Sequence, residues 1–127
     1  MKIAYNYQIF TAQIYGGVSR YYYNLVKELL KQDQDVKIFA GVHRNLLLAS
    51  LSEEVVKGRA LDNYPLKTIK AFQWLNHAIN EIQIQQWKPD IIHETYYSSK
   101  YTLKNDAVRV VTVHDMIHEL YPEQFPS

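Results

Sequence analysis

The strongest hydrophobic pattern in the chain follows two consecutive glycines, Gly16 and Gly17. Apolar residues recur there at intervals of three and four, which is the period of a helix with one buried face. The members of this stripe are Val18, Tyr21, Tyr22, Leu25, Val26, Leu29 and Leu30. The pattern predicts a helix that begins at the glycines and continues to about Lys31, with Tyr23 outside the buried stripe.

Short runs of strand-forming residues lie on either side of that helix. Residues 2–6 predict a buried central strand, and residues 36–40 predict a second strand that stops at Gly41. Residues 7–15 have the polar and aromatic composition of a loop. The beginning of the chain therefore predicts a strand–helix–strand unit.

The middle of the chain has weaker patterns. Residues 46–51 indicate a short helix with Asn45 as its cap. Residues 55–61 indicate a third strand, although Gly58 and Arg59 are unfavourable for it.

The pattern becomes clear again in the second half. A long helix from about Pro65 to just before Pro89 is predicted by an apolar stripe. Its members are Phe72, Leu75, Ile79 and Ile82, flanked by Ala71 and Ala78. Buried strands are predicted over residues 91–93 and 108–113, and Asp115 would cap a short helix through residue 120.

Strands that alternate with helices of this length predict a doubly wound α/β fold, that is, a Rossmann-like parallel sheet with helices on both faces. In such sheets ligands bind outside the carboxyl ends of the strands. The segments that follow the first, fourth and last predicted strands are 7–17, 93–97 and 114–115. We therefore expect the ligand site where these segments meet.

Three residues at the start of the first helix are candidates for binding an anion. Gly16 and Gly17 lack a Cβ, so their backbone can adopt positive φ and lie against a ligand. Free N–H groups and the positive end of the helix dipole favour a phosphate or carboxylate there, and Arg20 in the first turn also indicates an anion nearby. Two plainer interpretations stay open: the glycines form only a tight turn, or Arg20 pairs with a surface carboxylate.

Further candidates follow the buried strands. His114 ends the last strand at the ligand edge, where an imidazole can donate to a hydroxyl or a phosphate, so we favour a functional role for it. His93 is equally well explained as a neutral histidine satisfied by a backbone carbonyl. Asp115 is also explained as a helix cap.

Composition narrows the class of protein. The chain has 127 residues, 47% of them hydrophobic, which is one ordinary domain. The net charge of +1 and the scattered basic residues argue against nucleic acid as a partner. The absence of cysteine excludes disulfides, thiolate metal sites and a cysteine nucleophile. No segment has the pattern of a signal peptide or a membrane span, so we expect a soluble, cytoplasmic protein.

Several common sites lack their motifs. A dinucleotide site needs an acidic residue at the end of the second strand, where this chain has Gly41 and Val42. The sequence contains no phosphate-binding G-x-x-x-x-G-K-[ST], no G-x-S-x-G and no H-E-x-x-H motif, and His93 with Glu94 does not by itself make a metal site.

Three motifs in a fixed order do carry a resemblance. They are Q-I-Y-G-G-V-S-R-Y at 13–21, K-P-D-I-I-H-E-T-Y-Y at 88–97 and V-T-V-H-D-M-I-H-E at 111–119. Together with the first strand they resemble the N-terminal domain of a family 4 glycosyltransferase over nearly the whole chain. The resemblance implies the GT-B architecture, in which two Rossmann-like domains face each other across a cleft. It also implies transfer of a sugar from a nucleotide-sugar donor with retention of configuration, the N-terminal domain holding the acceptor.

The resemblance also implies roles for individual residues. Gly16 and Gly17 would lie against the donor phosphate or the transferred sugar, and His114 would be the catalytic residue beside the reacting sugar. Arg20 and His93 match positions near the cleft, and Asp115 would orient the loop around His114. Neither a metal nor a cofactor is implied, because the nucleotide-sugar is a co-substrate.

The chain departs from the family in one respect. The donor-binding Arg/Lys pair and the E-x7-E element belong to the second domain, so residues 1–127 are expected to be one acceptor-side domain, truncated before the donor domain and inactive alone. Strand 108–113 would then be a sheet edge, which predicts a homodimer or larger assembly through that edge or through residues 121–125. The membrane's inner face is a further expected location. The competing hypothesis is a stand-alone binding module for a phosphorylated sugar or nucleotide.

Overall fold

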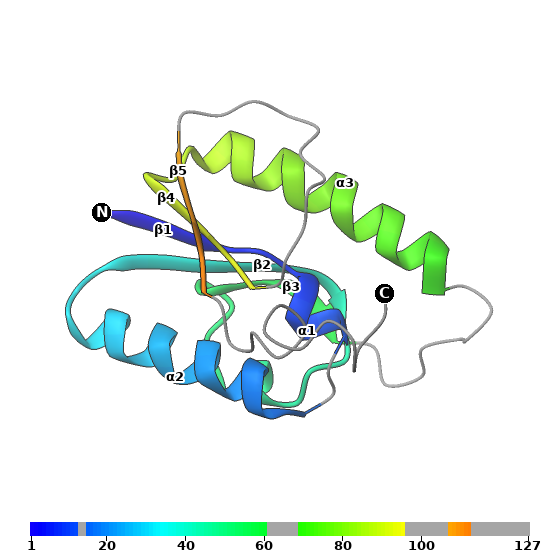
Figure 1. Ribbon diagram of the computed structural model, residues 1–127, viewed down its shortest axis with the longest axis horizontal. Helices are drawn as coiled ribbons and strands as arrows, with labels where there is room; N and C mark the ends of the chain where they lie inside the picture. Colours follow the sequence, from blue (N-terminus) through cyan, green and yellow to red (C-terminus); the bar gives the residue numbers. More distant parts are fainter. Residues whose placement is uncertain (13–14, 61–68, 96–106, 113–127) are drawn as a thin grey trace, which may run out of the picture.

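Five parallel strands form one sheet in the order β3-β2-β1-β4-β5 (Figure 1). The computed structural model describes residues 1–12, 15–60, 69–95 and 107–112. The strands are β1 Lys2–Tyr5, β2 Asp35–His43, β3 Val56–Ala60, β4 Ile91–Glu94 and β5 Val108–Val111. Every neighbouring pair is parallel, so the carboxyl ends of the strands meet at one edge of the sheet.

Helices cover both faces of this sheet. They are α1 Gln8–Ala12, α2 Gly17–Lys31, the 3₁₀ helix η1 Leu47–Ser50 and α3 Ile69–Trp87. In Figure 1, α2 lies on one face and α3 on the opposite face. The alternation of β1 explains this, because Ile3 and Tyr5 enter the core under α2, whereas Ala4 packs with Ile84 of α3. The predicted doubly wound, Rossmann-like α/β fold is confirmed.

Helix α2 follows its predicted range but buries a narrower face than predicted. Ser19, Tyr22 and Val26 are buried, one turn apart from each other, and burial of the Val26 side chain contributes about 1.5–3 kcal/mol. Tyr21 is 43% exposed, so its assignment to the buried stripe was wrong. Tyr23 lies beside the stripe, as predicted, and its hydroxyl lies 2.6 Å from Ser50 Oγ of η1.

The segment predicted as a loop before the glycines contains a helix, α1. Ile9 and Phe10 are 2% and 0% exposed and join the core under α2. The backbone N–H of Ile9 donates to Thr95 Oγ1 at 3.1 Å. The hydroxyl that satisfies the start of this helix therefore comes from the far end of β4, which explains why the local sequence shows no helix signal.

The short helix predicted around residues 46–51 is confirmed as η1. The N-cap position is occupied by Leu46 rather than by the expected Asn45, although Asn45 Oδ1 accepts a hydrogen bond from the Leu47 N–H at 3.0 Å. Leu48 is 2% exposed and fills the core under α2. The third strand is confirmed as β3, which lies at one end of the sheet of described strands.

Strand β2 does not stop at Gly41 but continues to His43. Gly41 has a φ of 61°, and the register with β3 shifts between Phe39 and Gly41, so the glycine forms a bulge that lets the strand go on. On the neighbouring strand, a Cβ at Gly58 would lie 2.9 Å from the Gly41 nitrogen. The two glycines that weakened the sequence pattern are therefore required where β2 and β3 approach closely.

The prediction that the apolar stripe forms the buried face of α3 is wrong. Leu75 and Ile82 are 40% and 52% exposed, while Asn76, Asn80 and Ile84, spaced four residues apart, are buried. The Phe72 side chain lies outside the description of the structure. Near the amino ends of the strands the buried face is apolar, with Ile84 packed on Ala4 and Phe39. Near the carboxyl ends it is polar, so hydrophobic periodicity alone selects the wrong face.

Asn76 shows why a polar side chain is stable in that position. Its Oδ1 accepts from the Val42 N–H at 2.8 Å, and its Nδ2 donates to the Val42 carbonyl at 2.9 Å. These bonds satisfy the backbone just after the Gly41 bulge, where the strand ladder is interrupted.

Strand β5 is at the other end of the described sheet. Val108, Val110 and Val111 are 64%, 37% and 43% exposed. Val113 and residues 121–125 lie outside the described residues. Assembly through this strand remains a prediction.

Gly41 provides a test of the bulge. Gly41→Ala should lower the free energy of unfolding by more than about 1–2 kcal/mol, because the left-handed backbone alone costs that much and the new methyl would meet the Asn76 amide. Urea unfolding measures the change. Gly17→Ala is the matched control, since a Cβ there meets nothing within 4 Å and the change should stabilise by less than about 1 kcal/mol. Equal effects of the two variants would contradict the bulge.

Candidate functional site

The carboxyl ends of β1 and β4 meet at the point where the winding of the sheet reverses. β1 pairs with β2 on one side and with β4 on the other. The chain reaches β2 through α2 on one face and reaches β4 through α3 on the opposite face. Open α/β sheets bind ligands outside the strands at such a reversal. The candidate site has two parts, one on each face of the sheet.

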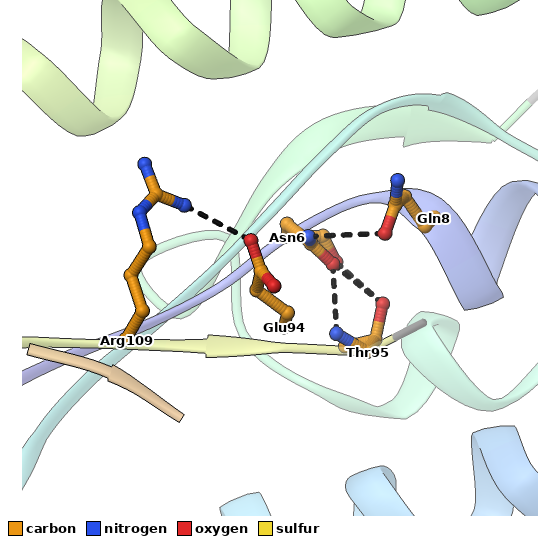
Figure 2. Close-up of polar contacts among 5 residues, drawn as sticks. All are labelled: Asn6, Gln8, Glu94, Thr95 and Arg109. Atoms are coloured by element: carbon orange, nitrogen blue, oxygen red, sulfur yellow. Dashed lines mark hydrogen bonds and ion pairs between the residues drawn. The ribbon is translucent and has the colours of Figure 1, made fainter. Parts of the chain in front are cut away.

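A hydrogen-bond cluster holds the two strand ends together (Figure 2). Asn6 Oδ1 accepts from the Thr95 N–H at 3.0 Å and from the Thr95 hydroxyl at 2.6 Å. Asn6 Nδ2 lies 3.4 Å from Gln8 Oε1. Asn6 and Thr95 are 7% and 1% exposed, so these bonds are protected from water and fix how far apart the strand ends lie.

Glu94 forms an ion pair on the α3 face. Its Oε1 lies 3.0 Å from Nη1 of Arg109 on β5, and Figure 2 shows both side chains on that side of their strands. The Glu94 side chain is 2% exposed and that of Arg109 is 26% exposed. A carboxylate this deeply buried needs a cationic partner, which is the role of Arg109.

On the other face, the helix α2 begins at the predicted glycine pair. Gly16 has a φ of −174° and a ψ of 168°, an extended conformation that any residue adopts. A Cβ on Gly17 would meet no atom within 4 Å, and among the described glycines Gly41 is the one with positive φ. The expected positive φ is thus absent from the pair, and the space beside Gly17 is open rather than filled by the fold.

Arg20 lies in the first turn of α2. Its guanidinium stacks 4.7 Å from the ring centroid of Tyr15, which is 55% exposed. Within the described part of the chain, no carboxylate lies within 4.0 Å of this guanidinium, so the interpretation as a surface ion pair gains no support.

His93 is 8% exposed and lies under α2. Its ring centroid is 5.1 Å from that of Tyr5 and 5.3 Å from that of Tyr22, and its Nε2 is 2.8 Å from Thr112 Oγ1. The Thr112 hydroxyl is therefore one partner of this imidazole. His93 links β4 to the carboxyl end of β5, after which His114 and Asp115 follow in the sequence. Both of those residues lie outside the described residues.

A polar pocket opens on the α3 face of the same edge. It is lined by Asn6, Tyr7, Gln8, His77, Asn80, Glu81, Ile92, Glu94 and Arg109. The rings of Tyr7 and His77 meet edge to face with centroids 6.4 Å apart. Burial, and then the nearby Glu81 carboxylate, raise the pKa of the Tyr7 hydroxyl, which keeps it protonated as a donor.

Sequence reasoning did not assign this pocket. The available signal was a run of polar residues at helical spacing inside α3, with Asn76 and Asn80 four residues apart and His77 and Glu81 beside them. Glu94 and Arg109 come from strands that join only in the folded sheet. Their pairing is therefore not visible in the sequence.

Comparison with known protein families gives a match over most of the chain. Residues 15–127 match Glycosyltransferase Family 4, a range that includes the start of α2, α3 and the end of β4 but not Asn6, Tyr7 and Gln8. The chain belongs to this family. No curated protein and no solved structure gave a significant match.

Among its described residues, this glycosyltransferase-family domain has no candidate metal centre. In that part of the chain, no three His, Cys, Asp or Glu side chains lie close enough to hold a metal ion. None of its helices combines the length and the apolar character needed to cross a membrane.

His43, at the end of β2, gives the domain a pH-dependent stability. The residue is 4% exposed, and burial lowers its pKa below the ordinary value of 6.5. Its Nδ1 accepts from the Asn45 N–H at 3.2 Å, which requires an unprotonated nitrogen. Because the unfolded chain takes up the proton first, the stabilisation is complete above about pH 6.5 and is lost as the pH falls from there toward the folded-state pKa.

The Glu94–Arg109 pair predicts an asymmetric result. Arg109→Gln should lower the free energy of unfolding by about 3 kcal/mol, because it leaves a buried carboxylate without a partner. The double variant Glu94→Gln/Arg109→Gln should recover most of this loss in urea unfolding. Lys31→Gln is the control, since it breaks an exposed pair with Glu28 and should cost less than about 1 kcal/mol. A double variant as unstable as Arg109→Gln would show that the charge is not the cause.

The His43 prediction compares the wild type with His43→Asn, whose amide oxygen can accept from Asn45 without titrating. Below about pH 6.5 the wild type should lose stability relative to the variant by at most about 1.4 kcal/mol per pH unit. Urea unfolding at several pH values gives the two curves. Parallel curves between about pH 7.5 and about pH 5 would contradict the burial of a neutral His43.

Proposed function

We propose that this domain is the acceptor side of a retaining glycosyltransferase of GT-B architecture, which transfers a sugar from a nucleotide-sugar to an acceptor bound at the carboxyl edge of the sheet. The observation that carries this proposal is the family match over residues 15–127. The reversal point between β1 and β4 supports it, since the match includes the start of α2 and the end of β4 on either side of that point.

The start of α2 is proposed to contact the donor phosphate or the transferred sugar. Free N–H groups at this end favour an anion, and the open space beside Gly17 lets a ligand approach the backbone. Arg20 adds a positive charge, and its stacking on Tyr15 reduces the conformational freedom lost when it binds. Neither close packing nor a positive φ requires a glycine at position 17, which supports a role in ligand approach.

His114 is proposed as the catalytic residue, with Asp115 orienting its loop. Support comes from the contact between His93 and Thr112, which holds the end of β5 against β4 two residues before His114. His93 then acts by positioning this strand end beside the cleft.

The donor pyrophosphate is proposed to bind a second Rossmann-like domain. A departing nucleotide diphosphate needs several fixed cations around it, whereas in the described residues Arg20 is the cation beside the start of α2. Residues 1–127 purified by themselves should then transfer no sugar from common nucleotide-sugars, beyond the level of a His114→Ala control.

The test uses the native gene product that carries these residues, assayed with a panel of nucleotide-sugars. Gly17→Val should reduce turnover by about 100-fold, because a side chain would displace the donor by about one ångström. The melting temperature should not change, since a Cβ at this position meets no atom within 4 Å.

Asn24→Val, an exposed position on the same helix, is the matched control for a β-branched residue in α2. Full activity of Gly17→Val would show that the glycines form only a turn. Absence of transfer by the native gene product, together with binding of a phosphorylated sugar or nucleotide, would favour the stand-alone binding module.

A further inference from the structure

We infer that the pocket on the α3 face binds the hydroxyl groups of an acceptor sugar that is uncharged or carries an amine, and that it rejects a phosphorylated acceptor. This inference rests on the proposed function and specifies the chemistry of the acceptor. It concerns the pocket between the strand ends and α3, on the opposite face of the sheet from the start of α2.

Asn80 is the residue that points to a ligand. It lines the pocket and is only 3% exposed, yet its Oδ1 has no hydrogen-bond partner among the described residues. A buried amide oxygen without a partner is destabilising, and such groups are rare in folded proteins. One turn earlier, Asn76 has both amide atoms bonded to the backbone, so the amide next to Asn80 on this face of α3 is satisfied.

Two acceptors of the pocket can take a donor from a ligand. The Asn80 oxygen is buried without a partner among the described residues, and the Glu81 carboxylate is a further acceptor in the lining. Hydroxyl and ammonium groups donate, whereas a phosphate or carboxylate offers only acceptors at neutral pH. The lining therefore complements a sugar hydroxyl or amine.

The charges around the pocket also favour a neutral or amine-bearing ligand. Glu94 is neutralised by Arg109 at 3.0 Å, and the further charged side chain in the lining is Glu81, which is 8% exposed. Among the lining residues, no cation other than Arg109 is present to offset the Glu81 carboxylate, apart from the titratable His77. The excess negative charge repels an anionic acceptor at short range in a poorly solvated site.

The lining also includes aromatic and apolar side chains. Tyr7 and His77 present half-buried aromatic rings on one side, and Ile92 is an apolar lining residue from β4. Sugar sites commonly combine apolar walls with a few convergent polar groups, as do ligand sites in general.

The experiment follows the amide resonances of the isotope-labelled 127-residue chain during titration with three probes: methyl glucoside, glucosamine and glucose 6-phosphate. The first two should shift resonances of Gln8, Asn80 and Glu81 with saturable millimolar affinity. Glucose 6-phosphate should bind at least about tenfold more weakly. Glu81→Gln should remove this discrimination against the phosphate.

Asn80→Leu separates a binding role from a structural one. It removes the unpartnered oxygen, so it should raise the melting temperature by a few degrees and abolish the sugar-induced shifts. Gln83→Leu is the matched control, because Gln83 Oε1 is also buried without a partner in the described residues but does not line the pocket. This control should be stabilised in the same way and keep sugar binding.

Three results would overturn the inference: no saturable shift with either neutral or amine probe, equal binding of the phosphate, or unchanged binding in Asn80→Leu. The first would mean that water satisfies Asn80. The binding titration requires neither a nucleotide-sugar nor a transfer step, so its outcome is independent of the transfer assay. Transfer by the native gene product without sugar binding at this pocket refutes only the pocket, whereas sugar binding without transfer refutes the proposed function.

Discussion

The hydrogen bonds between Asn6 and Thr95 set the spacing of the two strands on which the candidate site depends. Thr95 closes β4, and its hydroxyl also receives the N–H of Ile9, which starts α1. A single buried side-chain pair thus joins the end of β1, the end of β4 and the first helical turn after β1. The Glu94 carboxylate and the His93 ring come directly before Thr95, so their positions on the two faces follow from this link.

The fold could be predicted from the sequence because its main features are local. The helix α2 and the strands β1, β2 and β4 are each indicated by patterns that lie within a few residues, and each of these elements is found. The predicted end of β2 at Gly41 was wrong. In the sequence, a glycine that ends a strand cannot be distinguished from one that forms a bulge, because the bulge depends on a distant partner such as Asn76. The helix α1 was not predicted, because the hydroxyl that accepts the Ile9 N–H belongs to Thr95, which is distant in the sequence.

The site was only partly predictable. The edge of the sheet followed from the order of strands and helices, whereas the positive φ expected at Gly16 and Gly17 is absent and the pocket was not predicted. Asn76 and Asn80 lie on successive turns of α3 and are buried, although the buried face of a helix is usually apolar. The stripe predicted through Leu75 and Ile82 faces away from the sheet. Local sequence rules fail most readily where function opposes packing, and the unpartnered amide of Asn80 marks such a place.

The sheet itself divides the site. Neighbouring residues of β4 send the His93 ring under α2 and the Glu94 carboxylate toward α3, and no side chain of that strand reaches both faces. Substitutions in α3 and substitutions at the start of α2 should therefore combine additively, as expected for groups without shared contacts. Under the proposed function, a lineage could exchange the group recognised beside α3 while the residues beside Gly17 stay unaltered, so that one scaffold could diversify its acceptors without rebuilding its chemistry.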